Sequence, residues 1–120
     1  MIPTTTLWRP VGAEELALIE KSSWARFPPR LPEQPIFYPV CNERYAAEIA
    51  ERWNARDGRR GYVLKFEVES RFLAPYGPPR CVGATRHLEY WIPAEDLDAF
   101  NKAIVGRLEV VLRYEDAGEG

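Results

Sequence analysis

The stretch HLEYWIP, residues 87 to 93, carries three side chains whose chemistry is unusual for a β-strand. Successive side chains of a strand point to opposite faces, so His87, Glu89 and Trp91 are expected to share one face. Burying a carboxylate is costly unless it is paired. Glu89 is therefore either a cleft carboxylate that binds a ligand hydroxyl or stabilises a cation, or an acid that is solvated or paired with an arginine. His87 is either an acid–base group or a hydrogen-bonded structural residue.

Arg9 is the one charge in the stretch TLWRPV, where apolar side chains flank it at a spacing of two. Its guanidinium can fork onto a phosphate or a ribose. It can equally pair with Glu89 as a structural ion pair. The sequence leaves both interpretations open.

A proline-rich stretch, FPPRLPEQPIFYPV, covers residues 27 to 40 and holds five of the eleven prolines. Proline fixes φ and removes a backbone donor, so this stretch is expected to be a rigid loop. It either aims Arg30 and Tyr38 into a cleft or only covers a sheet edge. Phe37 and Tyr38 either stack on a ligand or pack in the core.

The hydrophobic pattern predicts the elements that position these residues. The expected strands are 4–11, 35–40, 61–68, 87–92 and 107–114. The expected helices are 13–23, 42–54 and 93–106. Residues 74–86, rich in Gly and Pro, are expected to form a loop. This order predicts an α+β fold, a compact mixed β-sheet domain with about three helices.

The segment NERYAAEIAERWN, residues 42–54, is the clearest of these helices. Asn42 is a plausible N-cap. One apolar stripe at helical spacing is formed by Tyr45, Ala46, Ile49, Ala50 and Trp53.

Length and composition predict a single domain, residues 1–120, with an ordered core at about 5–114 and a flexible tail at 115–120. The formal net charge of −2 argues against generic binding to nucleic acid or to an anionic membrane. No stretch approaches the ~20 apolar residues that span a bilayer, and the N-terminus lacks a signal-peptide pattern. A cytoplasmic location and no membrane partner are expected.

Cys41 and Cys81 lie forty residues apart, without a CxxC motif or a Cys/His cluster. No metal site is expected from this pattern, and two buried free thiols are favoured over a disulfide.

Four arginines follow the end of the 42–54 helix or lie in its last turn, namely Arg52, Arg56, Arg59 and Arg60. Cations near a helix C-terminus suit its dipole, so a solvated helix end is one interpretation. The other is a protein that faces nucleic acid through these residues.

An Arg in the first strand, an aromatic in the second and a Glu in a later strand resemble the arrangement of the ADP-ribosyltransferase superfamily. The chain more closely resembles short bacterial proteins of the "ADP-ribosylation/crystallin J1" group. The matching stretches are LWRPVGAEELALI, FPPRLPEQPIFYPV, YAAEIAERWN, GYVLKFEV and EYWIPAEDLDAFNKAIVG, within residues 7 to 110.

The resemblance implies an ADP-ribosyltransferase-like fold that binds NAD as a substrate, without a metal. It implies that Glu89 assists cleavage of the nicotinamide–ribose bond, while Arg9 and Tyr38 bind NAD. His87 is the second expected catalytic residue, and Arg30, Phe37 and Trp91 are the further residues expected to bind NAD. ADP-ribose would pass to an acceptor of unknown type, whether protein, nucleic acid or small molecule. The chain departs from the superfamily in having no Ser-Thr-Ser triplet, and His87 in place of an acid or amide two residues before Glu89. The alternatives are a non-catalytic binding or interaction module of the same fold, or a nucleic-acid-facing protein.

Overall fold

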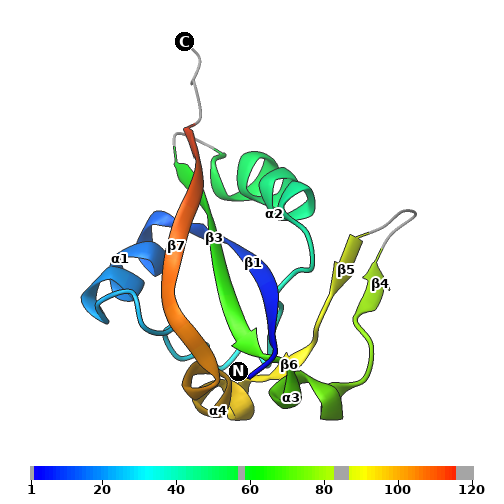
Figure 1. Ribbon diagram of the computed structural model, residues 1–120. Helices are drawn as coiled ribbons and strands as arrows, with labels where there is room; N and C mark the ends of the chain where they lie inside the picture. Colours follow the sequence, from blue (N-terminus) through cyan, green and yellow to red (C-terminus); the bar gives the residue numbers. More distant parts are fainter. Residues whose placement is uncertain (1, 57–58, 83–86, 116–120) are drawn as a thin grey trace.

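Three long antiparallel strands form the centre of this computed structural model, which describes residues 2–56, 59–82 and 87–115 (Figure 1). They are β1 (Thr4–Gly12), β3 (Arg60–Glu69) and β7 (Ile104–Glu115), in the order β1-β3-β7. The middle strand alternates as its sequence predicts. Its Tyr62, Leu64, Phe66 and Val68 all contact the larger hydrophobic cluster, whereas Val63 faces a smaller cluster on the other side. One face of the sheet is therefore covered by the larger cluster, and the other is covered in part by the smaller cluster.

Two small two-stranded sheets accompany the central one. Strand β2 (Ile36–Phe37) pairs with β6 (Ile92–Pro93), and β4 (Arg80–Val82) pairs with β5 (His87–Glu89). Val40 connects the central sheet to this second pair, because it forms antiparallel bridges with Trp8 on one side and with Glu89 on the other. The β4–β5 pair thereby lies beside β1 at the right of Figure 1.

Four α-helices surround the sheets in the described part of the chain, which confirms the α+β class. They are α1 (Ala13–Lys21), α2 (Glu43–Ile49), α3 (Ser70–Leu73) and α4 (Leu97–Lys102). Short 3₁₀ turns cover Ala74–Tyr76 and Ala94–Asp96, and a π-helix, Ala50–Asn54, continues α2. The N-cap prediction for α2 is confirmed: the Asn42 side-chain oxygen accepts a hydrogen bond of 2.7 Å from the backbone N–H of Tyr45.

The larger cluster is built around four phenylalanines, Phe27, Phe37, Phe66 and Phe100, each at most 2% exposed. Their ring centroids lie 5.0 to 6.4 Å apart in tilted or edge-on pairs, the separation that aromatic quadrupoles favour. Burying each ring contributes about 1.5–3 kcal/mol. Phe27 and Phe37 bound the proline-rich stretch, so this stretch is anchored in the core at two points.

Several element boundaries differ from the sequence prediction. The predicted strand 87–92 is interrupted between β5 and β6, and the predicted loop 74–86 contains β4. The helix predicted over 93–106 ends at Lys102, and Gly106 lies instead inside β7 with φ of +83°. The short α3 was not predicted. The tail predicted to be flexible lies outside the described residues, except for Glu115 at the end of β7.

The pairing of β7 with β3 is irregular at two points. The register shifts between Val63 and Leu64, and again between Lys65 and Glu67. The second shift accommodates Gly106 and its neighbours, which form the extra residues of β7. Such bulges bend a strand and increase its twist.

The π-helix changes which residues of the 42–54 segment are buried. The backbone N–H of Ala55 donates to the oxygen of Ala50, five residues earlier, at 2.9 Å. The buried positions are Ala46, Ala50 and then Ala55, a spacing of four followed by five. This wider turn takes Trp53 off the predicted apolar stripe, and its side chain is 62% exposed. The prediction that Trp53 belongs to the buried stripe is therefore wrong.

The start of β3 fits this wider turn because residue 61 is a glycine. A Cβ atom at Gly61 would meet the carbonyl oxygen of Ala50 far inside van der Waals contact. Substitution G61A is therefore expected to destabilise the fold by about 1–3 kcal/mol, as overpacking of a buried site does. Thermal or urea unfolding of the variant measures this effect.

Substitution G12A is a matched control for this experiment. A Cβ at Gly12 would meet its nearest neighbour, the Asn54 side-chain nitrogen, at an ordinary 3.9 Å. Its cost is limited to the weaker N-cap that Ala gives α1, below about 1 kcal/mol. Equal losses in the two variants would contradict the close approach of Gly61 to the π-helix.

Candidate functional site

Glu89 is a buried carboxylate held by two neutral donors. Its side chain is at the end of β5 and the residue is only 7% exposed. The Tyr45 hydroxyl donates to its Oε1 at 2.8 Å, and the Trp91 indole N–H donates to its Oε2 at 2.7 Å. Neither donor carries a positive charge, so these bonds fix the orientation of the carboxylate without neutralising it.

Tyr45 connects Glu89 to His87. The Tyr45 and His87 rings stack with their centroids 4.3 Å apart and their planes 6° from parallel. The His87 Nε2 lies 3.5 Å from the Glu48 Oε1. Burial, followed by the bond to Glu89, raises the pKa of the Tyr45 hydroxyl well above its ordinary value, so Tyr45 acts as a hydrogen-bond donor at neutral pH.

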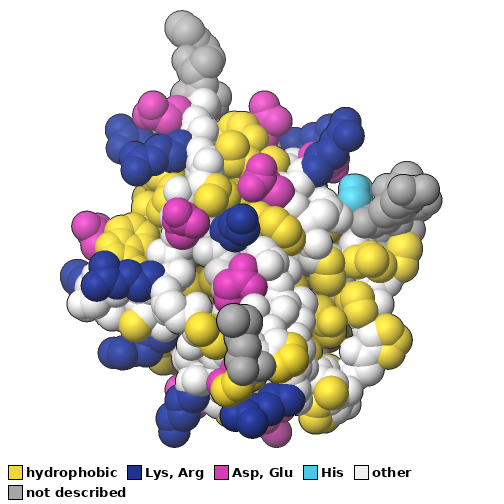
Figure 2. Space-filling view, in the orientation of Figure 1, with side chains coloured by type: hydrophobic (Ala, Val, Ile, Leu, Met, Phe, Trp, Pro, Cys, Tyr) yellow, Lys and Arg dark blue, Asp and Glu magenta, His cyan; other side chains and the backbone are white. Residues whose placement is uncertain are grey.

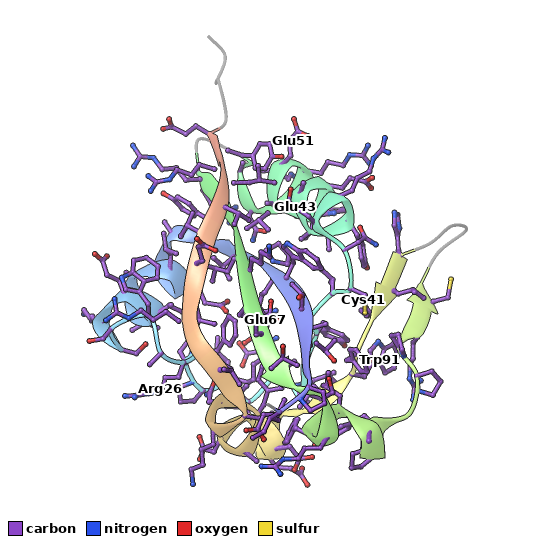
Figure 3. All side chains as sticks on the ribbon, viewed as in Figure 1. Arg26, Cys41, Glu43, Glu51, Glu67 and Trp91 are labelled. Carbon is purple, nitrogen blue, oxygen red and sulfur yellow. The ribbon has the colours of Figure 1, made fainter. Side chains whose placement is uncertain are left out.

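Trp91 and Tyr38 form an aromatic rim beside Glu89. Their rings meet edge-on with centroids 5.8 Å apart, and they are 39% and 37% exposed. The Arg80 guanidinium lies 4.2 Å from the Trp91 ring centroid, within cation–π distance. In Figure 3, Trp91 lies on the β4–β5 side of the molecule together with Cys41. The rim therefore offers π-faces and one cation.

Arg9 pairs with Glu15 of α1, and this answers one question that the sequence left open. Its Nε and Nη2 donate to the two Glu15 carboxylate oxygens at 2.8 and 3.1 Å, a bidentate pair. The guanidinium carbon lies 4.6 Å from the Phe37 ring centroid, and Arg9 is 8% exposed. Arg9 therefore does form a structural ion pair, but its partner is Glu15 and not Glu89.

Arg9 and Glu89 project from opposite faces of the sheet. Trp8, Val40 and Glu89 occupy one row of bridged residues, so their side chains share a face, and Tyr45 packs there. Arg9 follows Trp8 and points to the opposite face, where it reaches the phenylalanine cluster.

Arg30 lies near Arg9 but remains partly accessible. Its guanidinium carbon is 5.9 Å from the Phe37 centroid, and its buried Nε has no hydrogen-bond partner among the described residues. Burial and the nearby Arg9 lower its pKa, while Glu15 and Tyr38 act in the other direction. Phe37 itself is fully buried, so its ring packs beneath the guanidinium groups of Arg9 and Arg30 and does not offer a surface to a ligand.

The predicted site residues therefore form two groups. Glu89, His87, Trp91 and Tyr38 lie on the Tyr45 side, whereas Arg9, Arg30 and Phe37 lie together in or beside the phenylalanine cluster. Tyr38 connects them, because it contacts Trp91 and interacts electrostatically with Arg30. Sequence reasoning missed the polar roles of Tyr45, Glu48, Arg80 and Glu15. Glu15 offered one signal: its acidic side chain stands six residues after Arg9, just beyond a strand-to-helix turn.

Both cysteines are thiols rather than a disulfide, as predicted, but only Cys41 is partly buried, and Cys81 is exposed. The prediction that both thiols are buried is wrong for Cys81. The backbone of Cys41 bonds to Leu88, which is in turn the partner of Cys81 in the β4–β5 pair. One strand thus separates the cysteines, a spacing of about 10 Å that is too long for a disulfide.

Among residues 2–56, 59–82 and 87–115, no three His, Cys, Asp or Glu side chains gather in a way that could hold a metal ion. No helix in these ranges has the length and apolarity to cross a membrane. Comparisons of the chain with known protein families, curated proteins and solved structures found no match.

Burial and the neighbouring Glu89 raise the pKa of the Cys41 thiol to about 11. At pH 8 only about one Cys41 in a thousand would be the reactive thiolate. In a C81S variant, Ellman's reagent is expected to modify Cys41 slowly, with a rate that still rises with pH above 9. Adding E89Q removes the negative charge and should lower this pKa and increase the rate at pH 8.

The reciprocal C41S variant reports Cys81 alone and provides the reference rate for an exposed thiol. Equal rates for the two cysteines at pH 8 would contradict the environment described for Cys41. An unchanged Cys41 rate in the E89Q background would show that Glu89 does not influence it.

Proposed function

We propose that this protein binds NAD and transfers its ADP-ribose, with Glu89 as the catalytic carboxylate. The observation that carries the proposal is the arrangement of Glu89, a buried carboxylate fixed by the two neutral donors Tyr45 and Trp91. Burying a carboxylate away from most water is costly to a fold. A fixed carboxylate of this kind suits a reaction in which positive charge develops nearby.

Cleavage of NAD is such a reaction. The bond between the ribose C1′ and the nicotinamide ring nitrogen breaks, and both electrons pass to the nitrogen, which neutralises the pyridinium. The sugar becomes oxocarbenium-like, and a carboxylate beside it stabilises the charge. Each Glu89 oxygen accepts one protein hydrogen bond and retains a second lone pair, so it can also accept one from a ribose hydroxyl.

The surroundings of Glu89 offer groups that suit the rest of the dinucleotide. Tyr38 and Trp91 provide partly exposed rings for a nicotinamide or an adenine. Arg80 and Arg30, placed on either side of this rim, provide guanidinium groups for the pyrophosphate. A rigid proline-rich stretch before Tyr38 lowers the entropic cost of holding the aromatic rim in place when a ligand binds.

His87 is placed to handle the proton of the acceptor. The attacking group bonds to C1′ and releases its proton, which a neutral imidazole can take. Glu48, 3.5 Å from the His87 Nε2, would then stabilise the imidazolium. The stacked Tyr45 ring holds the imidazole plane in one orientation.

A non-catalytic binding module is the second candidate, and the environment of Arg9 favours it. The Arg9 guanidinium donates hydrogen bonds to both carboxylate oxygens of Glu15. It is nearly fully buried and points away from Glu89. Arg9 then stabilises the fold and takes no direct part in binding NAD.

Titration calorimetry with NAD, together with chromatographic detection of released nicotinamide, separates these functions. Wild-type protein is expected to bind NAD saturably and to release nicotinamide. E89Q should keep NAD affinity within about tenfold and lose at least about 100-fold in rate, as when an electrostatic catalytic group is removed. Substitution Y38A should weaken binding by about fivefold or more, the loss of a base-stacking ring.

E95Q is the matched control, because Glu95 is an exposed glutamate in the 3₁₀ turn after β6. It should leave both binding and release unchanged. Saturable binding without nicotinamide release would support the non-catalytic module. If NAD does not bind at millimolar concentration, the NAD proposal fails.

A further inference from the structure

We infer that the surface formed by Trp53 with Arg52 and Arg56 binds single-stranded nucleic acid. The three side chains come from the π-helix and the residues that follow it. Arg52 and Trp53 line a pocket of about 340 Å³ together with Tyr45, Glu48, Ile49 and His87. This inference does not depend on the proposed transfer of ADP-ribose.

Trp53 is exposed where a regular helix would have buried it. A helix that continued regularly from α2 would return residue 53 to the buried stripe of Ala46 and Ala50. The π-helix places Trp53 on the surface instead. Residue 61 must be a glycine because a Cβ there would collide with the Ala50 backbone of the π-helix. Isolated π-turns within helices frequently occur at functional sites. Leaving a large indole in water forgoes the stabilisation that its burial would provide.

Two arginines, Arg52 and Arg56, lie near Trp53. The Arg56 guanidinium lies 5.3 Å from the Trp53 ring centroid, within cation–π distance. Arg52 is a second guanidinium, and it lines the pocket together with Trp53. Figure 2 shows basic side chains gathered at the upper right, over α2 and near the chain's one histidine. An aromatic platform flanked by arginines is the combination that binds a base by stacking and its phosphate by charge.

The other end of the pocket offers hydrogen-bonding groups. The Glu48 carboxylate can accept a bond from the amino group of a base, and the His87 imidazole can donate or accept. These groups favour a base with an exposed edge, which single strands present and duplexes conceal. An acidic peptide would satisfy the arginines but would leave the indole and the hydrogen-bonding groups without matching partners.

The overall charge sets the expected strength of binding. With a net charge of −2 the protein has no molecule-wide basic field, so phosphate contacts must be local and few. Two arginine–phosphate contacts predict that log Kd rises with log salt concentration at a slope of about 1.4 for a single strand. A generic polycation would show a much steeper slope.

Fluorescence anisotropy with a labelled, mixed-sequence single strand of about eight nucleotides, as DNA and as RNA, tests the inference. The wild-type protein is titrated to about 100 µM at low salt, which covers ordinary non-specific affinities. Saturable binding of at least one strand is expected. W53A should weaken it about fivefold or more, W53F should retain most of it, and R52Q should weaken it and lower the salt slope by about 0.7.

R71Q is the matched charge control, because Arg71 is an exposed arginine of α3, at the other end of the molecule in Figure 1. It should bind as the wild type does, and all variants should unfold at similar temperatures because the substituted side chains are exposed. NAD titration of W53A should match that of the wild type, which keeps this result separate from the proposed function.

Any of the following outcomes would overturn the inference. The first is no saturable binding of either strand by wild-type protein. The second is equal affinity for a duplex or for polyglutamate, which would indicate charge alone or a peptide partner. The third is an equal loss in R71Q and R52Q, or no loss in W53A.

Discussion

The arrangement of this protein depends on the backbone bonds of one short segment, Pro39 to Cys41. On one side, Val40 exchanges hydrogen bonds of 2.8 and 2.9 Å with Trp8 of β1. On the other, the Pro39 oxygen accepts from Tyr90, and the Cys41 N–H donates to the Leu88 oxygen, each at 2.9 Å. The segment therefore acts as a three-residue strand that joins the central sheet to the β4–β5 pair. Together with the hydrogen bond from Tyr45, it fixes the position of Glu89 relative to α2.

This constraint gives the prolines of the preceding stretch a physical role. A strand of three residues forms few hydrogen bonds, and these offset little of the conformational entropy that is lost when the segment becomes ordered. A smaller entropy loss therefore favours the folded segment. Proline before the strand restricts the unfolded chain and lowers that entropy. Pro39 lacks an N–H, but only its carbonyl is used here, so it costs the ladder no bond. Phe27 and Phe37, both buried, fix the two ends of the stretch in the core.

The sequence predicted those features whose cause is local. The alternation of β3, the N-cap at Asn42 and the shared face of Glu89 and Trp91 follow from periods of two or from one capping side chain. The partner of Arg9 was not predictable in this way, because the choice between Glu15 and Glu89 depends on which face of the sheet Arg9 occupies. Trp53 was misassigned for a different reason. The Ala50 carbonyl of the π-helix lies against Gly61 of β3, a contact that the sequence of the helix alone does not reveal.

Only part of the candidate site could be predicted from the sequence. His87, Glu89 and Trp91 lie within five residues of sequence, so their proximity is a property of the sequence. Tyr45 contacts Glu89 from a separate helix, forty-four residues away. The sequence pattern placed Tyr45 in an apolar stripe and gave no sign that its hydroxyl donates a hydrogen bond. A tyrosine on the buried face of a helix can supply a donor to whatever lies across from it. Only the tertiary arrangement identifies the acceptor.

The irregular strand β7 has a consequence for the behaviour of the protein in concentrated solution. It occupies the outer position of the central sheet, and a long regular edge there would be a template for other chains. Its two register shifts and the positive φ of Gly106 interrupt the even row of donors and acceptors that a foreign strand needs. Charged side chains, including Arg107, Glu109 and Arg113, further interrupt that edge. The strand thus completes the fold while resisting the intermolecular pairing that begins amyloid-like aggregation.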